Sequence, residues 1–282
     1  MKNAALVTLP ETEVESRQYL RQLCHENHPP FCLRCHSREI YRLASGRNRC
    51  KRCHYTFSEF SGRWLSQSRL SCSEWIQVVA LFAAERTVEE IAHSLGRAYA
   101  TAFHAMTVLR AGILAHSRTS GTLLYDNPGM LQDLCHHRGR KSIRPFGHAP
   151  VFGIREEGES VCVPALPDVS PELVLGLPVK KVRRGNIVYT AQVAIYDTLV
   201  FTVSEKSSTM PCVHFCRSPV YIDGTRGFWT YACPRLAAHH GITPDYFPLY
   251  LKELEFRYNH RREAVEPILL QYLCDLMPQQ TH

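Results

Sequence analysis

The chain lacks any long apolar run. Residues 1–11 hold no apolar core of the length that a secretory signal needs, and no segment approaches the twenty or so apolar residues of a membrane span. We therefore expect a cytoplasmic chain with no membrane partner. In that reducing compartment its 12 cysteines would be thiols or thiolates rather than disulfides.

Several motifs of common enzyme classes are also missing. The sequence has no glycine-rich phosphate loop of the P-loop type and no Gly-x-Ser-x-Gly nucleophile motif. These two absences argue against a P-loop nucleotidase and against a serine hydrolase of that kind. There is no long low-complexity tract, which favours folded domains over an extended or disordered chain.

Four cysteines near the N-terminus are the strongest positive signal. Cys32 and Cys35 form one Cys-x-x-Cys pair, and Cys50 and Cys53 form a second pair after fourteen intervening residues. This spacing predicts one tetrahedral, four-cysteine structural zinc site on a small ribbon. The alternative is two disulfides or free thiols, and disulfides would need an oxidising environment. The other eight cysteines are scattered and are expected to be small buried residues.

Positive charge is concentrated around these cysteines. The formal net charge of the chain is +7, and in the stretch 34–69 the many basic residues are opposed only by Glu39 and Glu59. Each cation near a phosphate displaces a condensed counterion, so this balance predicts double-stranded DNA as the partner and a nucleoid-associated protein. The alternative is a solvated charged face. The candidate DNA contacts of the ribbon are Arg34, Arg38, Arg47, Arg49, Lys51 and Arg52.

The segment after the ribbon has a helical pattern. Its apolar spacing predicts helices over 71–114, with Ser71 or Ser73 as the first cap. Thr87 is expected to cap a second helix with Glu90 in a capping box, and Gly96 to make the turn that follows it. This order resembles a helix-turn-helix, although plain packing helices remain an alternative. The second helix of that motif would span 97–109, and its candidate DNA contacts are Arg97, Thr101 and His104.

The remaining chain changes from strands to helices, which predicts an α+β fold. Strands are expected at 123–126, 149–155, 160–166 and 186–193, and helices at 246–258 and 263–276. We expect four segments: 1–30, polar and partly helical; 31–60, the zinc ribbon with strands at 39–43 and 55–57; 61–118, the helix-turn-helix-like segment; and 119–282, an α/β domain with C-terminal helices.

Taken in order, these parts resemble a known family. The ribbon, the helical segment, a hairpin that reads Pro-Val-Phe-Gly-Ile at 150–154, and a closing helix that ends in Arg257-Tyr258-Asn259-x-Arg261 are similar to the Merlin superfamily of DDE transposases and its bacterial ISXO-type relatives. The resemblance implies an RNase-H-like domain in which two aspartates and a glutamate hold two Mg²⁺ or Mn²⁺ ions for DNA strand cleavage and transfer.

The resemblance also locates the three carboxylates, and two of them are missing. The first position is Asp126, the second is Ala191 and the third is Arg226. A cation about 4 Å from a divalent ion is repelled by several kcal/mol at an effective dielectric constant near 20. We therefore expect a degenerate site in which Asp126 alone is insufficient. Asp197 and Asp223 are the possible substitute ligands.

The sequence thus predicts a transposase-like DNA-binding protein with structural zinc, inactive in transposition, that forms a homodimer or pairs with an active relative. One alternative is an active transposase that uses substitute carboxylates together with Mg²⁺ or Mn²⁺. The other is a zinc-ribbon module for protein interaction. Steep loss of affinity with salt distinguishes a DNA binder from the latter.

Overall fold

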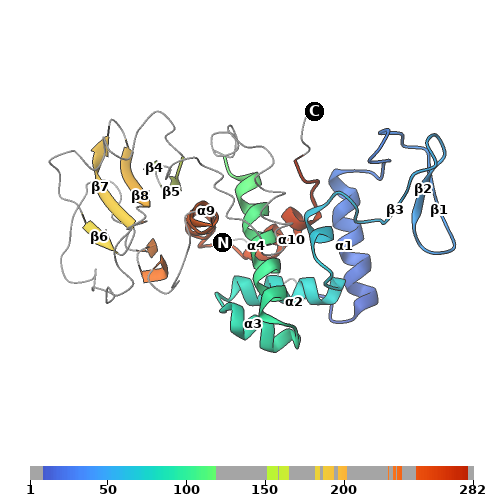
Figure 1. Cartoon of the computed structure of the whole chain (residues 1–282), viewed down its shortest axis with the longest axis horizontal. Helices are drawn as coiled ribbons and strands as arrows, with labels where there is room; N and C mark the ends of the chain where they lie inside the picture. The colour runs from blue at the N-terminus through green and yellow to red at the C-terminus, as the bar shows by residue number, and fades with distance from the viewer. Residues whose placement is uncertain are drawn as a thin grey trace. The chain divides into compact units, whose positions relative to one another are not determined.

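The computed structural model describes residues 9–118, 151–157, 159–164, 182–184, 187–193, 196–201 and 246–278, with short pieces between 228 and 236. The chain divides into two compact units, one of residues 1–113 and 262–282 and one of residues 114–261. Within the described residues both helices and strands are present, so the predicted mixed α and β fold is confirmed (Figure 1). In the same residues, no helix is both long enough and apolar enough to cross a membrane.

The first unit contains a three-stranded antiparallel ribbon. Its strands are β1 (Ile40–Arg42), β2 (Asn48–Cys50) and β3 (Thr56–Phe57), with β2 in the centre. Tyr41 lies opposite Arg49 across the first ladder. A turn at Gly46, whose φ of +78° suits glycine, joins the first two strands. The sequence predicted the outer two strands, and the structure adds the central one.

Four helices and a 3₁₀ turn make up most of the first unit. They are α1 (Glu13–Asn27), η1 (Trp64–Gln67), α2 (Cys72–Ala83), α3 (Val88–Leu95) and α4 (Tyr99–His116). Ser71 caps α2 and Thr87 caps α3, each in a capping box with the glutamate three residues on. Gly96 ends α3 in the left-handed conformation, φ +61°, so the predicted turn is confirmed.

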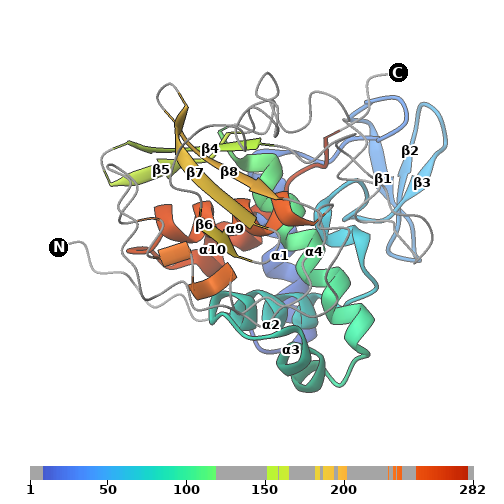
Figure 2. The same ribbon diagram turned by 60° about the vertical axis from the view of Figure 1, so that its left-hand side comes forward.

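The C-terminal helix belongs to this first unit. Helix α10 (Val265–Cys274) packs against α1, α2 and η1 (Figure 2). The chain after α10 contacts the segment that follows the ribbon: the N–H of Met277 donates to the carbonyl of Gly62 at 2.9 Å. The sequence grouped this segment with the C-terminal domain, but residues 262–278 contribute buried apolar side chains to the core of the first unit.

The second unit contains a five-stranded sheet. Its strands are β4 (Val151–Glu157), β5 (Ser160–Cys162), β6 (Val182–Arg184), β7 (Ile187–Val193) and β8 (Tyr196–Phe201), in the order β5-β4-β8-β7-β6. Each described pair of neighbours is antiparallel. The RNase-H-like topology stays a prediction, since the connections that define it lie outside the described residues.

Helix α9 (Phe247–Asn259) packs against the edge strand β5. The side chain of Asn259 pairs with both backbone groups of Val161: its Oδ1 accepts from the N–H at 2.7 Å and its Nδ2 donates to the carbonyl at 2.8 Å. The side chain of Asn259 thus makes the two backbone hydrogen bonds that a neighbouring strand would make with Val161. Through Asn259, the closing motif attaches α9 to the sheet.

Candidate metal centre and nucleic-acid interface

The two cysteine pairs form matching backbone turns. In the first, the N–H of His36 donates to the carbonyl of Cys32 at 2.8 Å, and in the second the N–H of His54 donates to the carbonyl of Cys50 at 3.1 Å. Both histidines have left-handed φ values, 57° and 58°. Each turn has the sequence Cys-x-Arg-Cys-His, so the ribbon contains a short internal repeat. The repeat presents two cysteines to one point from each side.

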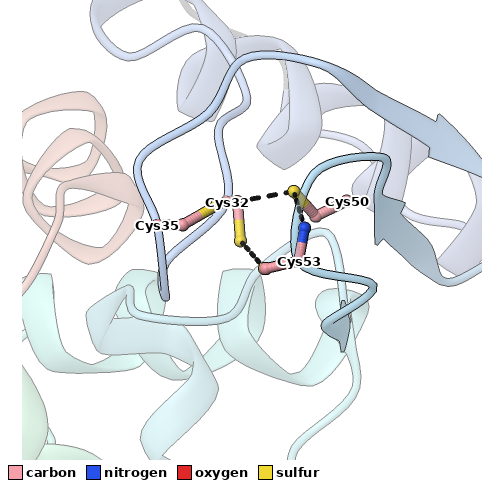
Figure 3. Close-up of side chains that lie close together, drawn as sticks. All are labelled: Cys32, Cys35, Cys50 and Cys53. Atoms are coloured by element: carbon pink, nitrogen blue, oxygen red, sulfur yellow. Dashed lines mark hydrogen bonds between the residues drawn. The ribbon is translucent and has the colours of Figure 1, made fainter.

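The four thiols meet at that point. The sulfurs of Cys32, Cys35, Cys50 and Cys53 all lie within 4.8 Å of one another, and they point toward a common centre in Figure 3. The separations Cys32–Cys53 and Cys35–Cys50 are each 3.5 Å. Tetrahedral zinc with bonds near 2.3 Å requires sulfurs about 3.8 Å apart. The donor set and its spacing therefore fit one structural zinc ion.

The environment of the thiols favours a bound cation. The N–H of Cys53 donates to the sulfur of Cys50 at 3.5 Å, and this bond, with others, lowers the pKa of Cys50 to about 6. The N–H of Ser37 also favours a Cys35 thiolate, but burial and the three neighbouring thiols raise the pKa of Cys35 to about 12. Four thiolates this close need a divalent cation to balance them.

Basic side chains surround this cluster. Arg34, Arg38, Arg47, Lys51 and Arg52 are exposed, and Arg49 is half-buried. Residues 31–58 contain seven arginines and lysines against one acidic residue, Glu39. The charged side chains that the ribbon exposes are therefore mostly cationic. This surface suits a polyanion.

The predicted DNA contacts of the helical segment have internal partners. The Nε of Arg97 donates to Glu74 at 2.7 Å, and this ion pair lowers the pKa of Glu74. His104 lies 2.8 Å from the carbonyl of Gln67 through its Nε2, and Thr101 is half-buried on the first turn of α4. The Arg97 side chain is nevertheless 51% exposed, and Tyr99 at the start of α4 is 52% exposed, so a role of Arg97 in DNA binding stays a prediction.

The described residues do not supply the carboxylate set that the resemblance implies. Ala191 lies in β7, where it brings a methyl group rather than a ligand. Asp126, Asp223 and Arg226 lie outside the described residues. The ladder between β7 and β8 shifts register between Thr190 and Val193, so that Ala191 and the next residue together oppose Asp197. The described residues therefore contain one of the three implied carboxylate positions, that of Ala191.

Comparisons with known proteins agree with the site. A family model described as a transposase zinc-ribbon domain matches residues 11–56. A model described as an ISXO2-like transposase domain matches residues 130–259. The chain is 34% identical over 95 residues to an uncharacterized transposase-like protein of Haemophilus influenzae, an alignment that covers 34% of this chain and 77% of that relative. No solved structure gives a significant match.

The ribbon match spans most of the segment that holds the four thiols, and the second match includes the strands and helix α9 of the second unit. The resemblance drawn from the cysteine pairs and the closing motif is thereby confirmed. The chain belongs to the ISXO2-like transposase family.

Proposed function

We propose that this protein binds double-stranded DNA through its zinc ribbon and the adjacent helices, and that it does not catalyse strand transfer. The observation that carries the proposal is the four-thiol cluster within a ribbon of seven basic residues and one acidic residue. A bound zinc ion would hold the two cysteine turns together. It would thereby fix the relative positions of the basic residues that lie next to the cysteines.

The inactive state follows from side-chain chemistry. Ala191 has no oxygen to offer a divalent cation, and Arg226 would bring a positive charge to the third carboxylate position that the resemblance assigns. Both changes weaken a two-metal site, because Mg²⁺ requires oxygen ligands at about 2.0–2.1 Å. The protein would then occupy element ends as a homodimer or together with an active relative.

One observation favours the rival function, an active transposase. Asp197 in β8 lies across the ladder from Ala191, at the irregular step between the two strands. The backbone register thus brings a carboxylate-bearing residue opposite the position of the lost ligand. If the protein cleaves DNA, Asp197→Asn should abolish that cleavage and leave DNA binding unchanged.

A single gel assay tests both functions. The purified protein is incubated with the ends of a related element in the presence of Mn²⁺, and binding and cleavage are scored in the same lanes. A shifted but intact duplex supports the proposal. Nicked or joined products would show that the carboxylate site has been rebuilt, and the absence of any shift would rule out DNA binding.

Zinc dependence has a direct test. Cys50→Ser removes one of the four sulfurs, so the ribbon should lose zinc and DNA binding while the second unit stays folded. Zinc content, gel shift and far-UV circular dichroism report these three properties. Cys162→Ser, which changes a buried cysteine of the second unit, serves as the control and should keep both zinc and DNA. Full DNA binding by Cys50→Ser would exclude a role for the ribbon.

A further inference from the structure

The ribbon sheet has two faces, and one of them covers the sulfur cluster. Ile40, Cys50 and Phe57 pack together with the cysteines on that inner face. Successive residues of a strand point to opposite faces. Tyr41 and Arg49, which are paired across β1 and β2, therefore lie on the outer face. The sheet thus presents a second surface that takes no part in the thiol cluster.

Thr56 joins the same outer face, because it pairs directly with Arg49 across β2 and β3. Arg47 immediately precedes β2, and its side chain reaches β3. Its Nη2 donates to the carbonyl of Thr56 at 3.3 Å, which fixes the guanidinium over β3. We call the four side chains Tyr41, Arg47, Arg49 and Thr56 the outer ribbon face.

The two arginines of the outer ribbon face have no acidic partner in the described part of the chain. The ion pairs found among the described residues involve a lysine, a histidine and arginines other than Arg47 and Arg49. The Nε of Arg49 is buried and makes no hydrogen bond to any described residue. The half-buried Arg49 thus has no carboxylate partner among the described residues.

The remaining groups of the face are also donors. Tyr41 is 41% exposed and carries a phenolic O–H, and Thr56 contributes a hydroxyl. Guanidinium and hydroxyl groups are among the side-chain groups that contact the sugar–phosphate backbone of DNA. Adjacent phosphates of one strand present the matching row of acceptors. Glu39, two residues before Tyr41, is the acidic side chain at the far end of β1.

We propose that the outer ribbon face binds the phosphate backbone of double-stranded DNA. The inference rests on the DNA-binding function proposed above and identifies the surface that performs it. The backbone N–H groups of Arg34 and Arg52, at matching positions of the two cysteine turns, donate to the sulfurs of Cys32 and Cys50, and the two side chains are exposed. They contribute attraction at long range, whereas Arg47 and Arg49 are positioned before DNA arrives and lose less side-chain freedom on binding.

The test compares two double variants of equal net charge. Full-length wild type, Arg47→Gln/Arg49→Gln and Arg34→Gln/Arg52→Gln are titrated onto a short mixed-sequence DNA duplex across a salt series, with anisotropy as the readout. Each phosphate contact contributes about 0.9 to the slope of log affinity against log salt. The outer-face variant should therefore lose about 1.8 of slope and about tenfold in affinity for each arginine. The turn variant should lose less than half of that slope.

Zinc content is measured on every variant, because both arginine pairs lie close to the cysteines. Arg47→Gln alone changes an exposed side chain and should lower the slope by about 0.9 even where the double variant holds less zinc. Two results would contradict the proposal that the outer ribbon face binds DNA: a wild-type salt slope in Arg47→Gln, or a larger loss of slope in Arg34→Gln/Arg52→Gln than in Arg47→Gln/Arg49→Gln. Neither result would contradict DNA binding itself. No binding by the wild type would instead remove the proposed function.

Discussion

At the scale of single residues, Arg63 shows how position overrides residue type. It is one of the basic residues of the stretch 34–69, yet only 3% of its surface is exposed. Its Nη1 donates to the carbonyl of Cys274, and its Nη2 donates to the carbonyl of His28 at 3.2 Å. Arg63 therefore joins the end of α1 to the end of α10 and is not available to DNA.

Replacement of Arg63 should destabilise the first unit. Arg63→Met keeps much of the volume but leaves the carbonyls of His28 and Cys274 without a donor. Charged hydrogen bonds of this kind contribute roughly 1.5–3 kcal/mol each, so we expect the free energy of unfolding to fall by about 2–4 kcal/mol. Urea denaturation measures it. Arg69→Met, at an exposed position, is the matched control, and an equal effect of both variants would contradict this role.

The closing motif provides a second prediction at this scale. Asn259→Asp keeps one acceptor for the Val161 N–H but places a second oxygen against the Val161 carbonyl. We expect the second unit to lose about 1–3 kcal/mol of stability, and Asn259→Ala to lose a similar amount, because a buried group is left unpaired in each case. Thermal unfolding followed by circular dichroism would measure the change. Wild-type stability of Asn259→Asp would argue against the strand-like pairing.

At the scale of elements, local signals predicted helix ends well. Thr87, Glu90 and Gly96 are placed by rules that involve only three or four neighbouring residues, and α3 begins and ends where those rules put it. The central ribbon strand was missed because β2 is short and polar except for Cys50. The internal partners of Arg97 and His104 were also missed, since Glu74 and Gln67 are distant in sequence.

A long-range cap gives the first unit a dependence on acid. The carboxylate of Glu13 accepts from the N–H of Cys72 at 3.2 Å and from the N–H of Ser73 at 2.8 Å, at the start of α2. Although burial opposes ionisation, these hydrogen bonds lower the pKa of Glu13. The ion pair with Arg97 likewise lowers the pKa of Glu74.

A carboxyl group whose pKa is lowered by folding stabilises the protein above its unfolded pKa. That stability is lost as the pH falls through the folded value. We therefore expect the unfolding midpoint of the first unit to fall as the pH drops below about 4.3, the ordinary value for a glutamate. Glu13→Gln should be less stable at neutral pH and should show a shallower acid dependence. Glu11→Gln, at an exposed position before α1, should follow the wild-type profile.

At the scale of the whole molecule, the first and the last helix of the described chain, α1 and α10, pack together in one unit. Leu20 and Cys24 of α1 and Leu273 and Cys274 of α10 are at most 1% exposed. The Sγ of Cys274 donates to the carbonyl of Leu20 at 3.5 Å. The apolar pattern of α10 predicts a buried helix, but it does not predict which other helices α10 packs against. This arrangement therefore could not be predicted from the sequence pattern.

The C-terminal segment should consequently be required for the N-terminal unit to fold. A chain that ends at Arg261 lacks α10, so the apolar faces of α1, α2 and η1 that contact this helix would be exposed to water. Five buried apolar side chains leave the core in that variant: Leu269, Leu270, Leu273, Cys274 and Met277. Fully burying a leucine contributes about 1.5–3 kcal/mol, so their joint loss is comparable to the whole stability of a small domain.

We expect rapid proteolysis of residues 1–113 and loss of DNA binding in the chain that ends at Arg261. A chain that ends at Pro278 should behave as the wild type in limited proteolysis and gel shift. Wild-type resistance to protease in the chain that ends at Arg261 would mean that the N-terminal segments fold without the C-terminal helix.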